Sequence, residues 1–449
     1  MKHYLVILSC LLLSLSVSYS QENSSSFTLQ EAIDYALENN RSAKNAARDI
    51  EAAIRQKWET TATGLPQISA SVDYQNFLKQ QVSVVPAEFF GGEPGDFEEV
   101  IFGTEQNVNA SATLRQLIFD GSYLVGLQSA KVFLEISKNA KEKTDLDIRK
   151  AVINAYGNVL LAEENLKIIT NDISVLEKNL FETQKIFENG LGEEESVEQL
   201  QITLSQLKSN YSNTARLKDL AYNMLNVTMG LPIENQTRLS DNLTGLTSQN
   251  TVLSLLEADE NIENTIDYKI AANDKRSKEL LLKLEKSKAL PQLSGFLNAG
   301  YVSFSNDFSF FDSDQSWSGF SLFGLSLNVP IFSSLGRTAA TQRAKINLEK
   351  SKDDLTEVEQ QLKLQIAQAK SNYKFAIEDY EIKKENLGLA KRIETKNQTK
   401  FFEGIASSFE LRQAQTQLYS AQQELLRAML DVINQKTNLE TVLNQIPLN

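Results

Sequence analysis

The sequence predicts a mainly α-helical protein that also carries transmembrane β-strands and is built from two copies of one pattern. Three observations predict this fold class: an internal duplication, two long proline-free stretches with heptad-spaced apolar residues, and four segments in which apolar and polar residues alternate. Each copy should contain a helix, two strands, a long helix, a glycine turn and a returning helix. The copies span residues 21–232 and 263–449, and a connector at 233–262 joins them.

Residues 1–20 are predicted to form a cleaved secretory signal peptide. A basic start at Lys2 precedes an apolar run from Tyr4 to Leu15, and small residues follow before Gln21. The run is too short for a membrane-spanning helix, which needs about 20 residues. Cys10 leaves a lipoprotein as an alternative, although it lies inside the apolar run, whereas a lipidation site normally follows it.

Composition disfavours an enzyme. Cleavage would remove His3 and Cys10, the only histidine and the only cysteine of the chain. The mature protein then lacks disulfides, thiolate or imidazole metal ligands and Ser-His-Asp triads, so we expect no metal or cofactor. No nucleotide-binding glycine loop follows any candidate strand. The formal net charge of -13 disfavours duplex nucleic acid as a partner.

The duplication is marked by short motifs in the same order in both halves. They are Leu65-Pro66-Gln67 and Leu290-Pro291-Gln292, then Ile118-Phe119 and Ile331-Phe332, then Gly190 and Gly404. The spacing from the Ile-Phe pair to the glycine is nearly equal in the two halves, while the spacing between the strands differs. Loops tolerate insertions, but packed helices must keep their register. The two helical arms are therefore the parts that have nearly the same length in both halves.

The two arms are predicted as helices from about Ser122 to Asn189 and from about Arg337 to Glu403, because neither stretch contains proline. Apolar residues recur in steps of three and four, which predicts coiled-coil packing. In the first arm they are Ile148, Val152, Ala155, Val159, Ala162, Leu166, Ile169, Ile173, Leu176 and Leu180. In the second they are Leu355, Leu362, Ile366, Ala369, Tyr373, Ala376, Tyr380, Leu387 and Ala390, with Glu359 and Lys383 as polar exceptions.

Four segments with a period of two are predicted as strands, at Ile68–Gln75, Val108–Arg115, Leu297–Tyr301 and Phe323–Val329. The helices use their apolar stripes on each other, so lipid is the evident partner for the apolar side of the strands. A bilayer requires such strands to close into a barrel. Because four strands make too narrow a barrel, several chains must contribute to one.

Three segments are interpreted as connections. Leu78–Gln106 and Val302–Ser316 are expected to be irregular surface loops on the extracellular side, because outer-membrane barrels place their long loops there. The polar stretch Glu234–Asn250 is expected to link the two halves.

The turns between the helices are the candidate functional site. Gly190 and Gly404 are expected to form helical tip turns with positive φ, and Ser407 with Glu410 has the capping-box spacing. The first tip carries an acidic cluster formed by Glu193, Glu194, Glu195 and Glu198. The alternative is that these acids only stabilise a solvated helix N-terminus.

The chain resembles the TolC family of outer membrane efflux proteins. The duplicated plan, the Leu-Pro-Gln junctions and Phe402-Glu403-Gly404 followed by Leu411, Gln415 and Leu418 carry this resemblance over about Thr28–Gln445. It implies a homotrimer in the outer membrane, in which each subunit gives four strands to one β-barrel. A long coiled-coil α-barrel would continue this barrel as a tunnel across the periplasm.

The resemblance also implies an acidic selectivity ring at the periplasmic entrance, just after the second tip glycine. Counted from Gly404, the first acidic position of the family falls on Glu410. The second falls on Gln413, and the basic position near the ring falls on Ala406. The ring is therefore only partly kept.

The predicted function is an outer-membrane exit duct that passes small toxic compounds outward, without enzymatic activity. The resemblance implies a periplasmic adaptor and an inner-membrane transporter as partners. Type I protein secretion is an alternative within the same fold. A periplasmic coiled-coil adaptor or a structural rod is a further alternative, but neither would need four strands with a lipid-compatible side.

Overall fold

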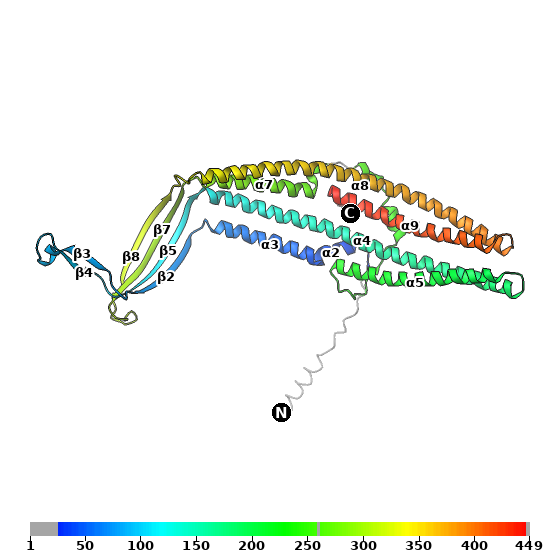
Figure 1. Cartoon of the computed structure of the whole chain (residues 1–449), viewed down its shortest axis with the longest axis horizontal. Helices are drawn as coiled ribbons and strands as arrows, with labels where there is room; N and C mark the ends of the chain where they lie inside the picture. Colours follow the sequence, from blue (N-terminus) through cyan, green and yellow to red (C-terminus); the bar gives the residue numbers. More distant parts are fainter. Residues whose placement is uncertain (1–25, 258–260, 446–449) are drawn as a thin grey trace, which may run out of the picture. The chain divides into compact units, whose positions relative to one another are not determined.

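The computed structural model describes residues 26–257 and 261–445 and is mainly helical (Figure 1). The predicted signal peptide, Cys10 and the last residues of the second repeat lie outside the described residues. The helices are α2 (Leu29–Asn39), α3 (Arg41–Ala62), α4 (Gly121–Glu188), α5 (Glu194–Met229), α6 (Leu243–Gln249), α7 (Ile266–Ser287), α8 (Gly336–Phe402) and α9 (Ser408–Leu443). The strands are β1 (Ser26–Phe27), β2 (Gln67–Asn76), β3 (Val82–Pro86), β4 (Phe97–Ile101), β5 (Gln106–Asp120), β6 (Arg238–Leu239), β7 (Gln292–Ser305) and β8 (Ser318–Asn328).

The chain divides into two compact units, and each unit draws on both predicted repeats. One unit comprises residues up to Arg48, Asn139–Lys269 and the chain from Glu357. It holds a helical bundle with α5, α6 and α9. The other comprises Asp49–Lys138 and Ile270–Thr356 and holds the strands β2 to β5, β7 and β8 with most of α3 and α7.

The long helices follow the predicted stretches closely. α4 and α8 begin and end within one residue of the expected limits, and α5 and α9 return with 36 residues each. Thr28 caps α2 and forms a capping box with Glu31. Gly230 ends α5 at φ 86°, and a Cβ there would lie 2.6 Å from the carbonyl oxygen of Asn39. Glycine is therefore required at this position both by the turn and by the close approach of α2.

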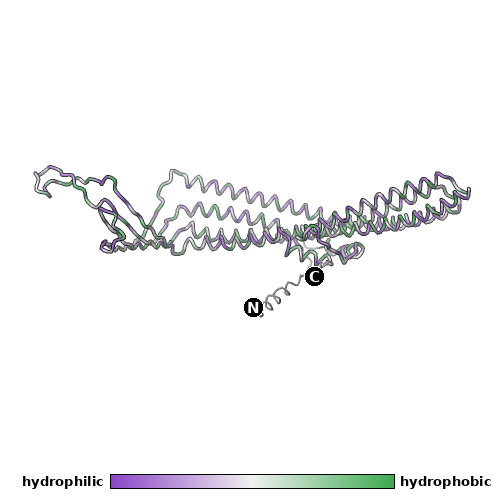
Figure 2. Tube along the Cα trace, turned by 90° about the horizontal axis from the view of Figure 1, so that it is seen from below, coloured by the Kyte–Doolittle hydropathy of each residue, from purple (hydrophilic) through white to green (hydrophobic). Residues whose placement is uncertain are grey.

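The predicted heptad positions form the buried side of both long helices. Every one of them is buried or partly buried, and Val152, Val159 and Tyr373 are fully enclosed. These three residues belong to a core that also includes residues of α2, α5 and α9. Apolar and polar residues are interspersed along the helices instead of forming one apolar block (Figure 2). The coiled-coil prediction is thus confirmed.

The four predicted strands form one antiparallel sheet in the order β2-β5-β7-β8. The register aligns Ile68, Leu114, Leu297 and Phe323 in one row across all four strands, on the predicted apolar face. Three of these side chains are exposed and Leu114 is half-buried. β2, β5 and β7 extend beyond the predicted limits at both ends, whereas β8 begins earlier than predicted and ends at Asn328, just before the predicted limit. Their lengths are 10, 15, 14 and 11 residues.

The opposite face of this sheet is polar in its inner strands. The neighbouring row contains Ser69, Thr113, Asn298 and Leu322, and the Asn298 amide donates to the Thr113 hydroxyl at 2.7 Å. β5 carries an irregularity between Leu117 and Phe119, where its register against β7 shifts by one residue.

The expectation of an irregular loop at Leu78–Gln106 was wrong. This segment contains a second antiparallel pair, β3 and β4, joined by a short 3-10 helix at Ala87–Phe90. Four consecutive residues, Val82–Val85, contain three β-branched valines, which favour strand pairing over an irregular loop. The loop after β7 is shorter than expected, because β7 continues to Ser305.

The connector is more than a polar link, because it packs into the helical bundle. β6 pairs with β1 in parallel, and α6 buries Leu243, Leu246 and Thr247. Two short 3-10 helices, Leu253–Glu257 and Ile262–Asn264, lie on either side of the undescribed residues 258–260. Leu243 and Leu246 have the spacing of one helix face, but the surrounding residues are polar, so the sequence did not predict this helix.

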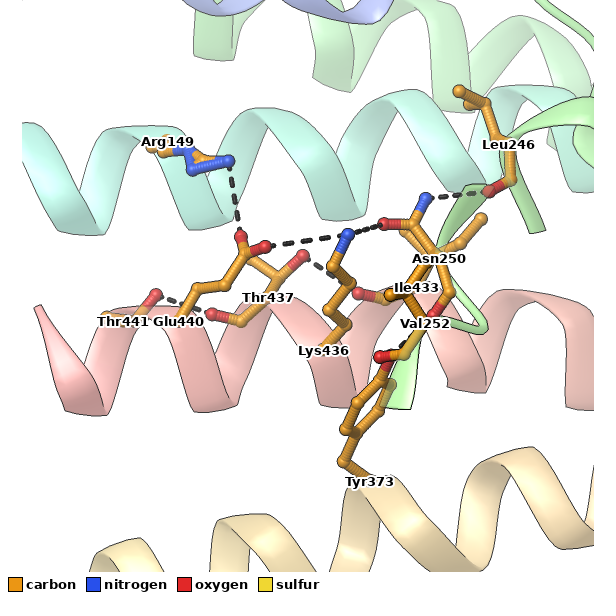
Figure 3. Close-up of polar contacts among 10 residues, drawn as sticks. All are labelled: Arg149, Leu246, Asn250, Val252, Tyr373, Ile433, Lys436, Thr437, Glu440 and Thr441. Atoms are coloured by element: carbon orange, nitrogen blue, oxygen red, sulfur yellow. Dashed lines mark hydrogen bonds and ion pairs between the residues drawn. The ribbon is translucent and has the colours of Figure 1, made fainter. Parts of the chain in front are cut away.

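A buried polar network attaches the connector to α4, α8 and α9 (Figure 3). The Tyr373 hydroxyl donates to the carbonyl oxygens of Asn250 and Val252 at 2.7 and 3.0 Å. The Lys436 ammonium donates to the Asn250 side-chain oxygen at 2.8 Å. Glu440 lies between Lys436 and Arg149, at 3.6 and 3.2 Å. Burial raises the pKa of Glu440 even though both cations oppose that shift.

No helix within the described ranges is both long enough and apolar enough to span a membrane.

Candidate functional site

The first helical tip is a tight turn between α4 and α5. Gly190 has φ 75°, and its N–H donates to the Phe187 carbonyl at 2.8 Å. The Leu191 N–H then donates to the Ile186 carbonyl at 3.0 Å, so the last carbonyls of α4 are satisfied by the turn itself. A Cβ at Gly190 would meet no atom within 4 Å, which leaves positive φ as the reason for glycine.

The second tip, between α8 and α9, has the same geometry. Gly404 has φ 72°, and the Ile405 N–H donates to the Lys400 carbonyl at 2.8 Å. Ser407 then caps α9. Its N–H donates to Glu410 Oε2 at 2.8 Å, and the Glu410 N–H donates to the Ser407 hydroxyl oxygen at 3.3 Å.

Glu410 is an exposed carboxylate held in its charged form. The Ser407 N–H and hydroxyl donate to it, and the charge of Lys400 adds to their effect, so the pKa of Glu410 is lowered. Gln413 lies three residues further along α9 and is also exposed. The two side chains therefore share one side of the first turns of α9.

The predicted glutamates of the first tip lie at the start of α5. Glu193 is the N-cap residue without a side-chain capping bond, and Glu194 and Glu195 occupy the first turn. All of them are exposed, as is Glu198, and Glu195 accepts a hydrogen bond from Gln199 at 2.7 Å. Both tips lie at the same end of the helical bundle (Figure 1). Among the described residues, no hydrogen bond or ion pair joins Glu410 to these glutamates.

A buried polar layer behind the tips was not predicted from the sequence. Asp172 of α4 is only 7% exposed and accepts a long hydrogen bond from Gln422 of α9, at 3.5 Å. Burial raises its pKa to about 6, against the weaker effects of Gln422 and Lys391. The pKa of Glu394 is also raised, first by burial and then by the charge of Asp172. Glu394 lies one heptad step after Ala390, and this spacing could have predicted that Glu394 faces the inside of the bundle.

A second polar layer lies closer to the tips. The Gln398 amide of α8 donates to the Asn179 side-chain oxygen of α4 at 2.9 Å. The Asn179 side-chain nitrogen, the Thr183 hydroxyl and the Gln415 side-chain oxygen are buried without a hydrogen-bond partner. A buried polar atom without a hydrogen bond lowers the stability of the fold. The tip end of the bundle is therefore less favourably packed than the apolar core around Val152.

The raised pKa of Asp172 predicts a pH-dependent stability. The pKa of this carboxyl rises from 3.8 to about 6 on folding, so the folded chain binds more protons than the unfolded chain between these pH values. The contribution of Asp172 to the free energy of unfolding is therefore fully present below about pH 4 and is lost as pH rises through about 6. Asp172→Asn should therefore stabilise the chain above pH 7 by on the order of 2 kcal/mol and change little at pH 4. Denaturant unfolding at both pH values measures this, with the exposed Asp219→Asn as control. An equal effect at both pH values would contradict the assignment.

Comparison with known proteins identifies the fold. The outer membrane efflux protein family matches residues 32–231 and 258–445. The chain belongs to this family. Among solved structures, this family member is similar to VceC of Vibrio cholerae, with 15% identity, a TM-score of 0.71 and coverage of 92% of this chain and 95% of that one.

Two further outer membrane channels have the same fold as this efflux-family chain. CmeC of Campylobacter jejuni is 16% identical, with a TM-score of 0.71 and coverage of 96% of this chain and 90% of that one. MtrE of Neisseria gonorrhoeae, in its open state, is 19% identical, with a TM-score of 0.70 and coverage of 95% and 93%. No curated protein sequence matches the chain. The relatives are channel proteins and not enzymes, and the predicted family is confirmed.

Proposed function

We propose that this protein is an outer-membrane exit duct that carries small toxic compounds from a periplasmic adaptor and an inner-membrane transporter to the outside. Membership of the efflux family supports this over the adaptor and the structural rod. The observation that carries it is the four-stranded sheet, because its apolar face is exposed and both of its edge strands, β2 and β8, lack a partner strand among the described residues.

The two open edges favour a homotrimer. A bilayer leaves no backbone edge unpaired, so β8 of one copy would pair with β2 of the next until the barrel closes. The strands have 10 to 15 residues, which is long enough to span a bilayer, since a tilted transmembrane strand needs about 9–11 residues. The apolar row that contains Ile68, Leu297 and Phe323 would then face lipid, and the row that contains Ser69, Thr113 and Asn298 would face the lumen.

The helical arms would form the periplasmic tunnel, with the tips at its entrance. This assignment is supported by the exposed, charged tips. Type I protein secretion uses the same architecture and is the second candidate.

The experiment that tests the proposed function combines localisation with mass. The mature chain should fractionate with outer membranes, and its protein mass in detergent should be that of three copies. The expected mass follows from barrel width, because four strands cannot enclose a water-filled lumen. Recovery as a soluble periplasmic protein, or as a stable monomer or dimer in detergent, would exclude the shared barrel.

Glu410 is proposed to contribute to cation selectivity at the entrance. In a trimer it would recur once per subunit around a narrow opening, where low-dielectric walls focus its field. Glu410→Gln keeps the size and the capping geometry but removes the charge, so cation preference should fall, and it should fall further when the first-tip glutamates are also replaced. Reversal potentials across a salt gradient in planar bilayers measure this preference.

Gln413→Glu is the matched opposite change, because it adds a carboxylate to the same side of α9. It should raise cation preference. Unchanged reversal potentials in the single, combined and opposite variants would mean that these carboxylates only cap solvated helices.

A further inference from the structure

The β3–β4 hairpin forms a small sheet of its own, separate from the four-stranded sheet. Its register pairs Val82 with Ile101 and Pro86 with Phe97. These four residues lie on one face together with Val84 and its partner Glu99. This mainly apolar face is open to solvent: Val84 is 62% exposed and Phe97 is 70% exposed. The hairpin extends away from the end of the four-stranded sheet, within the same unit (Figure 1).

No strand of the described residues pairs with the outer edge of β3. The Ala87 N–H donates to the Asp96 carbonyl at 2.9 Å and therefore points toward the β4 side. N–H groups alternate along a strand, so those of Val85 and Ser83 also point toward β4, while those of Val84 and Val82 point outward. Pro86 agrees with this alternation, because it lacks an N–H on the outward side.

β3 also lacks the usual protection of an edge strand. Natural edges are blocked by charged side chains, bulges or covering elements. β3 carries no charged residue, whereas β4 carries Glu98 and Glu99. Pro86 closes only one end of the edge. The segment Val82–Val85 thus offers an extended, uncharged backbone edge beside an exposed, mainly apolar face that also carries Glu99.

The charge of the hairpin indicates which partner fits. Residues 82–105 contain six acids and no lysine or arginine. The acids are Glu88, Glu93, Asp96, Glu98, Glu99 and Glu105. None of them takes part in an ion pair within the described part of the chain. A second copy of the hairpin would bring six more carboxylates to the contact, so charge disfavours self-pairing.

We propose that the outer edge of β3 binds an extended basic segment of another protein by strand addition. Main-chain hydrogen bonds to Val82 and Val84 would supply the pairing, the apolar face would receive alternate side chains, and the carboxylates would select lysine or arginine. The inference rests on the proposed function for the extracellular position of the hairpin.

The binding test uses the full chain in detergent and a dye-labelled synthetic peptide of alternating lysine and valine. Fluorescence anisotropy should show saturable binding that weakens with added salt. The same peptide with glutamate in place of lysine should bind at least about tenfold more weakly, since like charges oppose it. Equal binding of the two peptides would overturn the proposal.

Val84→Pro isolates the edge, because it removes one outward N–H. Loss of one hydrogen bond of about 1 kcal/mol corresponds to roughly fivefold weaker binding, and the proline ring adds steric hindrance. Val84→Thr keeps the N–H and the branched shape, so it should bind like the parent. Both variants are made with Val82→Cys and Ile101→Cys, which lie opposite each other and can form a disulfide that holds the hairpin together.

Three results separate the explanations. Unchanged binding by the disulfide-locked Val84→Pro variant would refute pairing at this edge. A change of mass in detergent caused by Val84→Pro would instead assign the edge to contacts between copies and would also overturn the proposal. An epitope inserted at Gly92 should label on intact cells. Labelling only after permeabilisation would refute the extracellular position and with it the orientation in the proposed function, whereas peptide binding is measured independently of transport.

Discussion

Replacing Leu297 by arginine should largely abolish assembly in the membrane. Leu297 lies on the central strand β7, in the apolar row with Leu114 and Phe323. An arginine on the lipid side of a barrel costs about 2–4 kcal/mol near the bilayer midplane, and a trimer would carry it three times. The trimer fraction in detergent extracts and the denaturant midpoint of folding into lipid vesicles measure the loss.

Ser326→Arg is the matched control for this substitution. Ser326 lies on the neighbouring strand β8 and is also exposed, but it alternates with Leu325 and Leu327 and so lies on the other face of the sheet. It should reduce trimer formation far less than Leu297→Arg. If both substitutions have the same effect, the two faces of the sheet do not differ in their surroundings, and the lipid assignment is incorrect.

Arg149→Ala should destabilise the helical bundle by about 3 kcal/mol. Glu440 is 7% exposed and would lose its contact with Arg149, which is itself only 15% exposed. Breaking a buried pair by removing one partner costs about 3–5 kcal/mol, and the lower end applies because Lys436 remains 3.6 Å away. Denaturant unfolding followed by circular dichroism measures the change.

A double substitution separates the charge from the packing of Arg149. Adding Glu440→Gln to Arg149→Ala removes the unpaired carboxylate and should recover most of the loss. Lys167→Ala serves as the surface control, because Lys167 is 78% exposed in its pair with Glu164 and should contribute less than about 1 kcal/mol. An equal loss in the free energy of unfolding for Lys167→Ala and Arg149→Ala would contradict the contribution of the buried network.

The long helices could be predicted from the sequence because their signals are local and repeated. Heptad spacing fixes which side is buried, and the lack of proline fixes how far each helix can run. The tip turns follow from Gly190 and Gly404 for the same reason, since one residue type meets a local backbone requirement. The four strands could be predicted from alternation, but the predicted segments for β5 and β7 were too short at both ends, because these two strands extend each other by mutual pairing.

The buried polar layers and the hairpin depend on contacts that sequence patterns do not encode. Asp172 resembles any surface acid of a charged helix, and its burial depends on neighbours from other helices, among them Gln422 and Tyr419 of α9. In the hairpin, an apolar run and a cluster of acids show no period of two, although β3 and β4 pair over five residues each. The connector was predicted, but its packing into the bundle was not, because Leu243 and Leu246 stand in a polar stretch.

The pairing of β1 with β6 ties the beginning of the described chain to the connector. Ser26 pairs with Arg238, and the Leu29 N–H at the start of α2 donates to the Asp241 carboxylate at 2.7 Å. The first described residues of the chain thus find their partners more than two hundred residues later. Closing a loop of this length costs more conformational entropy than forming a local contact. The beginning of the described chain is therefore held by a long-range contact to the connector, so a substitution in β6 or at Asp241 would release α2 from a site far away in the sequence.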